Sequence, residues 1–131
     1  MILVDSSVWI DFFNGHDKPH VEKLYQLLGQ ELIATGDLIM VEVLQGFSSD
    51  KDFRKAQELF EILPCFSLCS QELAFKAARN YRFLRKNGVT VRKTIDMVIG
   101  TFCIENNLDL LHADQDFKSI EKYLGLRTIY I

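Results

Sequence analysis

A chain of 131 residues has the length of one domain. Hydrophobic residues make up 48% and charged residues 25% of it, and its two prolines and seven glycines are too few for a disordered or low-complexity protein. The formal net charge of −3 argues against a protein that coats nucleic acid by charge alone. We therefore expect one compact, soluble domain that spans residues 1–131.

Two features bear on where the protein works. The longest apolar runs are much shorter than the roughly 18 residues of a membrane-spanning segment, and no basic, apolar leader follows Met1. The cysteines at 65, 69 and 103 are odd in number and lie in apolar stretches, so we expect free thiols, with at least one of Cys65 and Cys69 facing the core. These features predict a cytoplasmic protein that does not associate with a membrane.

Short apolar runs alternate with longer segments of helical period, which is the pattern of an α/β domain. The expected strands are residues 2–5, 32–35, 66–68, 108–112 and 128–131. Helices with start signals lie between them, namely 19–28 with Pro19 in its first turn, 38–47 after Asp37, 53–62 after Asp50, 73–86 after Ser70 and 95–105 after Thr94. Parallel strands joined by right-handed crossovers predict a three-layer α/β/α sandwich with a mainly parallel, roughly five-stranded sheet.

Acidic residues are expected to meet at the carboxyl edge of this sheet, where such folds bind ligands. Asp5 ends the first strand, Asp114 and Asp116 follow the fourth, and Asp96 lies in the first turn of helix 95–105. Glu42 interrupts an apolar helix, where a charge is costly unless it faces a cation or a water-filled cleft. Gathered carboxylates repel one another unless a divalent cation neutralises them, and hard oxygen ligands select Mg²⁺ or Mn²⁺.

Each aspartate also has a purely structural interpretation. The helix dipole favours an acid such as Asp96 in a first turn, and Asp114 or Asp116 is suited to cap a helix. Glu42 is harder to explain in this way, since acids are seldom placed in an apolar helix for solvation alone. The joint placement at strand ends favours the metal site.

Four ordered segments resemble the PIN domain of VapC-type toxins: MILVDSSVWIDF at 1–12, Glu42 before VLQG, KTIDMVIG at 93–100 and LLHADQDF at 110–117. The resemblance covers the whole chain. It implies a PIN-like fold and a Mg²⁺- or Mn²⁺-dependent endoribonuclease, the toxin of a type II toxin–antitoxin pair, in which water attacks the RNA phosphodiester and leaves a 5′-phosphate and a 3′-hydroxyl. It also implies a catalytic quartet of Asp5, Glu42, Asp96 and Asp114, and metal binding by Asp5, Asp96, Asp114 and Asp116.

The same resemblance implies further contacts. Ser6 would hydrogen-bond a ligand carboxylate or metal-bound water, a small antitoxin would lie across the active site, and two copies of the chain would form a homodimer. The apolar helix at 8–13 supports partner binding, because it carries more hydrophobic surface than a small core readily covers. The chain departs from the family at residues 112–113, where His and Ala replace a frequent hydroxyl residue near the fourth acid. This departure concerns a supporting hydrogen bond and not the ligand itself.

Positive charge is concentrated in one segment. Residues 73–95 contain seven basic and no acidic residues. On the helix that ends at Lys86, Leu73, Ala77, Tyr81 and Leu84 form the core-facing stripe. The RNA-binding residues that we expect are Arg79, Arg82 and Lys86 on its exposed flank, with Arg92 and Lys93 close to Asp96. The alternative is a solvated face near an acidic partner.

Other functions explain the residues less well. His16 and His20 have no neighbouring third ligand for zinc. A response-regulator receiver needs a phosphate-accepting aspartate after the third strand and a lysine after the fifth, and the sequence supplies neither. The remaining alternative is a non-catalytic RNA- or protein-binding module of the same fold, which the intact set of acids argues against.

Overall fold

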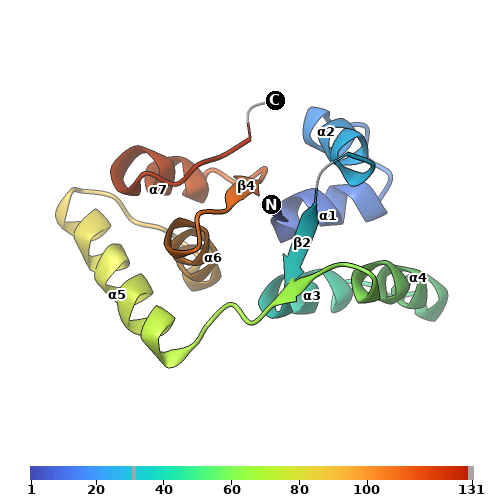
Figure 1. Ribbon diagram of the computed structural model, residues 1–131, viewed down its shortest axis with the longest axis horizontal. Coiled ribbons are helices and arrows are strands. Elements are labelled where there is room, and N and C mark those ends of the chain that lie inside the picture. The colour runs from blue at the N-terminus through green and yellow to red at the C-terminus, as the bar shows by residue number, and fades with distance from the viewer. Residues whose placement is uncertain (31, 130–131) are drawn as a thin grey trace.

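The computed structural model describes residues 1–30 and 32–129 and has a parallel sheet at its centre (Figure 1). Its strands are β1 (Ile2–Val4), β2 (Ile33–Gly36), β3 (Cys65–Phe66) and β4 (Asp109–Leu111), in the order β3-β2-β1-β4. Ile2 of β1 pairs with Ile33 on one side and with Asp109 on the other. The predicted three-layer α/β/α sandwich with a parallel sheet is confirmed.

The described residues form seven helices, of which the first six lie between the strands and the last follows β4: α1 (Ser6–Phe13), α2 (Pro19–Leu28), α3 (Asp37–Leu44), α4 (Asp50–Glu61), α5 (Gln71–Lys86), α6 (Thr94–Glu105) and α7 (Asp116–Leu124). Helices α1 to α4 pack with one another on one side, and α5 to α7 pack together on the other (Figure 1). The sheet lies between these two groups, so both of its faces are covered, as its continuous apolar strands require.

The predicted fifth strand at 128–131 is not confirmed. Thr128 forms an isolated parallel bridge with Leu110, and Ile129 donates a backbone hydrogen bond of 3.0 Å to the Leu110 carbonyl. Tyr130 and Ile131 lie outside the described residues. Within the described residues the sheet therefore has four strands, because the segment after α7 makes too few ladder contacts with β4 to form a strand.

Most helix starts follow the predicted signals. Ser70 caps α5 by accepting a hydrogen bond from the Leu73 amide, and α2 begins at Pro19. Helix α4 begins earlier than predicted, because Ser49 is its cap and Asp50 its first residue. Helix α3 ends at Leu44, before the predicted end at residue 47.

Helix α6 is the buried centre of the α5 to α7 group. Every residue from Asp96 to Cys103 is buried. At Gly100 a Cβ atom would lie 3.1 Å from the Ile120 side chain, so the glycine lets α6 and α7 approach closely. This close approach brings the start of α6, which carries Asp96, next to the start of α7, which carries Asp116.

The aromatic residues of α1 are mostly covered by the chain itself. Trp9 is buried, and its ring packs against those of Phe12, Phe13 and Phe60. Ile10 is the one residue of this helix among the exposed large hydrophobic side chains of the described residues, so the expected hydrophobic surface on this helix is reduced. The aromatic cluster mainly joins α1 to α4.

The expectation for Cys65 and Cys69 was wrong, because both are exposed. Strand β3 is a two-residue strand at the sheet edge, and Cys65 within it is exposed, while the buried apolar residue of this segment is Leu68. Cys103 in α6 is buried, and burial raises the pKa of its thiol to about 12, which makes it unreactive. No helix within residues 1–30 and 32–129 is long and apolar enough to cross a membrane.

Candidate active site

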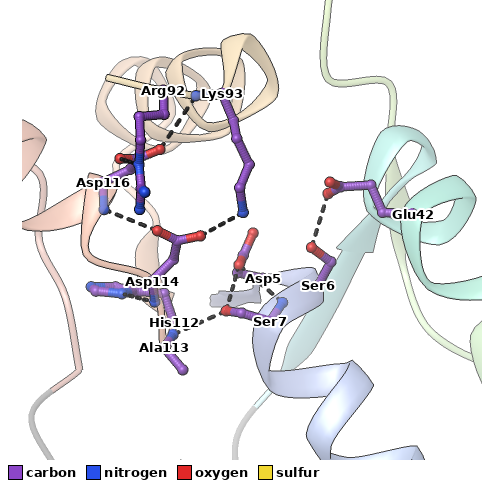
Figure 2. Close-up of polar contacts among 10 residues, drawn as sticks. All are labelled: Asp5, Ser6, Ser7, Glu42, Arg92, Lys93, His112, Ala113, Asp114 and Asp116. Atoms are coloured by element: carbon purple, nitrogen blue, oxygen red, sulfur yellow. Dashed lines mark hydrogen bonds and ion pairs between the residues drawn. The ribbon is translucent and has the colours of Figure 1, made fainter. Parts of the chain in front are cut away.

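The predicted acidic residues converge at the carboxyl edge of the sheet, and Figure 2 shows four of them: Asp5, Glu42, Asp114 and Asp116. Asp5 follows β1 and caps α1, and its amide donates a 2.9 Å hydrogen bond to the Leu111 carbonyl at the end of β4. Asp114 follows β4, while Asp96 and Asp116 lie in the first turns of α6 and α7. The adjacent strands β1 and β4 therefore carry their acids to one place, as their parallel pairing predicts.

Three of these acids form a compact group. Asp96, Asp114 and Asp116 each offer one carboxylate oxygen, and the three oxygens lie within 4.8 Å of one another. The Asp116 amide donates a 3.0 Å hydrogen bond to Asp114 Oδ1, which orients the Asp114 carboxylate. Asp114 is not the N-cap of α7, which is Gln115, although its carboxylate does accept the hydrogen bond from the first residue of that helix.

Asp5 and Asp96 have buried oxygens that lack protein partners. Asp5 is 2% exposed and Asp96 is 3% exposed. Asp5 Oδ1 and Asp96 Oδ2 have no hydrogen-bond partner in the described residues. A buried carboxylate oxygen without a donor is costly to desolvate, and a cation compensates that cost. The orphaned oxygens and the oxygen-only donor set fit a hard divalent ion such as Mg²⁺ or Mn²⁺.

The pKa values of these acids reflect the same arrangement. Burial raises the pKa of Asp96 to about 8, with the charge of Asp5 and a hydrogen bond to Asp116 adding to the effect. Burial also raises the pKa of Asp5, although hydrogen bonds from Ser7 act in the opposite direction. Without a divalent cation, this group of carboxylates resists full ionisation at neutral pH.

Glu42 extends from α3 toward the same cluster (Figure 2). Ser6 Oγ donates a 2.9 Å hydrogen bond to Glu42 Oε1, so the predicted contact from Ser6 to a carboxylate is present. Partial burial raises the pKa of Glu42, and the charges of Asp5 and Asp114 raise it further. The four predicted catalytic acids thus share one electrostatic neighbourhood, although Glu42 and Asp5 lie outside the compact group.

The predicted RNA-binding residues fall into two sets. Lys93 Nζ lies 2.7 Å from Asp114 Oδ2, and Arg92 Nε lies 3.8 Å from Asp116 Oδ1. The other set, Arg79, Arg82 and Lys86, is exposed along α5. The core-facing stripe of α5 is confirmed for Leu73, Ala77 and Leu84, which are buried, and Tyr81 is partly buried.

Ser7 and His112 are positioning residues that the sequence did not reveal. Ser7 Oγ donates a 2.6 Å hydrogen bond to Asp5 Oδ2 and accepts one of 3.0 Å from the Ala113 amide. His112 Nδ1 accepts a 3.3 Å hydrogen bond from the Asp114 amide, and its ring packs against Phe117. Ser7 thus supplies a hydroxyl group next to residues 112–113, where the chain lacks the hydroxyl residue that is frequent in the family. In the sequence, the only indication of this role is a second serine two residues after Asp5.

His16 and His20 make a separate cluster on the surface. Their ring nitrogens lie 3.0 and 2.5 Å from the two carboxylate oxygens of Asp11. The shared carboxylate joins the end of α1 to the start of α2. The histidines therefore have an evident structural role.

A parallel α/β sandwich with carboxylates clustered at its carboxyl edge is an arrangement that can bind a hard cation next to a ligand. The PIN domain model matches residues 2–123, and the chain belongs to the PIN domain family.

Curated relatives cover nearly the full chain. Ribonuclease VapC11 of Mycobacterium tuberculosis and VapC ribonuclease Mb1587 of Mycobacterium bovis are each 30% identical to it, over 98% of this chain and 97% of theirs. The VapBC2 structure from Rickettsia felis, bound to a DNA fragment from its promoter, has a TM-score of 0.75 at 17% identity and covers 98% of both chains. VapC20 of M. tuberculosis, described as a sarcin-ricin loop cleaving toxin, has a TM-score of 0.70 at 13% identity, over 91% of this chain and 94% of its own. These two structures share the fold.

Proposed function

We propose that the protein is a Mg²⁺- or Mn²⁺-dependent endoribonuclease and the toxin of a toxin–antitoxin pair. The observation that carries the proposal is the pair of buried, unpartnered oxygens on Asp5 and Asp96 beside the compact group of three aspartates. The names of the curated relatives, which are VapC ribonucleases at 30% identity, support the same activity.

The residues have distinct roles in this proposal. Asp96, Asp114 and Asp116 would hold the divalent ion, with the unpartnered oxygen of Asp5 as a further ligand. When bound, the ion activates water and offsets charge on the phosphoryl oxygens. Glu42, held by Ser6 and with a raised pKa, is suited to accept a proton from the attacking water. Ser7 holds the Asp5 carboxylate in position.

Substrate binding is assigned to the basic residues. Arg79, Arg82 and Lys86 are exposed on α5, and Arg92 is exposed beside Asp116. Segment 73–95 is free of acids, so it attracts a phosphate backbone in a chain whose net charge is −3. RNA held along α5 would reach the acid cluster through Arg92 and Lys93.

The proposed antitoxin contact lies between α1 and α3. A pocket of about 100 Å³ there is lined by Ile10, Phe13, Glu42, Val43 and neighbouring residues. An apolar peptide segment seated in this pocket would lie against Glu42, so binding and catalysis would compete. The VapBC complexes among the solved structures of this fold support an antitoxin partner. A homodimer and a cytoplasmic location complete the proposal and rest on the family.

The activity is tested with purified protein freed of any bound partner. Total RNA is incubated with it in Mg²⁺, in Mn²⁺ and in excess EDTA, and the fragment ends are mapped. We expect cleavage that needs the metal and leaves 5′-phosphates. Equal cleavage in EDTA would rule out the metal-dependent mechanism, and RNA binding without cleavage in either metal would instead support the non-catalytic module.

A further inference from the structure

Lys93 places a cation inside the acid cluster. The residue caps the start of α6, and its amide donates a 3.3 Å hydrogen bond to Asp116 Oδ2. Its side chain reaches into the cluster and ends near Asp114 and Asp5 (Figure 2). The 2.7 Å distance from Nζ to Asp114 Oδ2 is that of a charge-assisted hydrogen bond.

This contact joins a half-exposed cation to a mostly covered carboxylate, because the Lys93 side chain is 54% exposed and solvent screens it in part. The Asp114 side chain is 14% exposed, and Asp96 and Asp5 also contribute to the field at the Lys93 ammonium. Arg92 contacts the cluster at 3.8 Å, and its side chain is 76% exposed, so its contribution is weakened by solvent. Lys93 is therefore the better placed of the two basic residues to offset the charge of the acids.

We propose that Lys93 is a built-in cation of the acid cluster, which competes with the divalent metal ion for Asp114. The inference rests on the proposed metal site. In the metal-free protein the ammonium offsets the repulsion among the carboxylates. A metal ion that approaches the compact group meets a like charge and an Asp114 oxygen already engaged.

This arrangement gives Lys93 two successive partners. Lys93 would be held less strongly by Asp114 with an ion bound, because both cations would share the same carboxylate. Its ammonium would then be available to an RNA phosphate at the metal site. The RNA-binding role predicted for Lys93 thus begins only when the ion is in place.

The test measures metal binding and stability rather than cleavage. Mn²⁺ is titrated calorimetrically into metal-free wild type, Lys93→Gln, Lys93→Arg and the control Lys55→Gln, and thermal unfolding is followed in EDTA and in saturating Mn²⁺. Lys55 is exposed on α4, so the control removes the same charge outside the cluster. We expect Lys93→Gln to bind Mn²⁺ about tenfold more tightly than wild type.

We also expect Lys93→Gln to melt several degrees lower than wild type in EDTA, and this deficit to shrink in saturating Mn²⁺. Lys93→Arg and Lys55→Gln should resemble wild type in both measurements. A Lys93→Gln protein that is unfolded in EDTA and folds on adding Mn²⁺ supports the inference, and one that stays unfolded in Mn²⁺ overturns it.

Two further outcomes separate the inference from the proposed function. Unchanged or weaker Mn²⁺ binding by Lys93→Gln, with wild type binding the ion, overturns the role of Lys93 and leaves the metal site intact. Failure of both wild type and Lys93→Gln to bind Mn²⁺ overturns the metal site itself, and the inference with it.

Discussion

The acid cluster and the basic face of α5, which consists of Arg79, Arg82 and Lys86, carry opposite charges. The cluster is largely buried, and the basic face is exposed to solvent. Asp5 and Asp96 are almost fully buried, whereas Arg79, Arg82 and Lys86 stand in water. Buried charges interact strongly with their neighbours because little solvent screens them, while exposed charges act weakly and nearly independently. A single change in the cluster should therefore abolish a function, and several changes on α5 should only weaken one.

The largest effect is expected from Asp96→Asn. The variant keeps the shape of the side chain but removes a proposed metal ligand, so RNA cleavage in Mg²⁺ should fall by on the order of 10³-fold or more. The measurement is the initial rate of RNA fragmentation. Asp17→Asn, on the exposed loop before α2, is the matched control and should cleave like wild type. Undiminished cleavage by Asp96→Asn would remove the acid cluster from the mechanism.

The same residue should make the stability of the metal-free protein depend on pH. Asp96 has a pKa of about 8 when folded, against an ordinary value of 3.8, so the folded state binds the extra proton between these values. Protonated Asp96 therefore contributes fully to the free energy of unfolding below pH 3.8. This contribution decreases as the pH rises from 3.8 toward 8, by at most about 1.4 kcal/mol per pH unit.

This pH dependence is checked by denaturant unfolding in EDTA from pH 5 to pH 8. Asp96→Asn should be more stable than wild type at pH 8 and should show a flatter decline, since its amide does not ionise. Asp17→Asn should retain the wild-type slope. Parallel curves for wild type and Asp96→Asn would contradict the raised pKa.

A smaller effect is expected on the basic face. Replacing Arg79, Arg82 and Lys86 by glutamine in one variant should weaken RNA binding about tenfold at low salt. The slope of log affinity against log salt concentration should also become shallower, by the amount expected for the loss of up to about three phosphate contacts. Mn²⁺ binding should not change. The matched control replaces Lys51, Arg54 and Lys55 on α4, which are also exposed. Wild-type salt dependence in the α5 variant would reassign this face to a protein partner.

The smallest effect concerns Ser7. Ser7→Ala removes the hydroxyl between Asp5 and the Ala113 amide, and should lower the free energy of unfolding by about 1 kcal/mol. It should also reduce cleavage, because Asp5 loses an orienting donor. Ser48→Ala, at an exposed position between α3 and α4, is the control for both measurements. A Ser7→Ala protein as active and as stable as wild type would show that the amide of residue 7 is sufficient to hold Asp5.

Local patterns were sufficient to predict most of the helices and the edge of the sheet where the acids meet, but they did not predict α7 (Asp116–Leu124). The cap at Ser70 and the proline at residue 19 act within one helical turn, so their effects are readable from neighbouring residues. The fifth strand and the buried thiol at residue 65 or 69 were predicted from apolar runs alone. Whether an apolar run pairs with a neighbouring strand, or is buried by other side chains, depends on segments far away in the sequence. Here residues 128–129 and the run around Cys65 and Cys69 both lie at the edges of the sheet.

The sequence by itself determined the parallel α/β architecture and the arrival of Asp5, Asp96, Asp114 and Asp116 at one edge, because strand direction and helix phase follow from local periodicity. Only the tertiary structure decided which oxygens meet. The Ser7 contact to Ala113 joins residues 106 positions apart, and the Lys93 contact to Asp114 joins residues 21 apart. The first contact depends on the pairing of β1 with β4, and the second on how α6 packs beside β4 and α7, and spacing along the chain specifies neither arrangement.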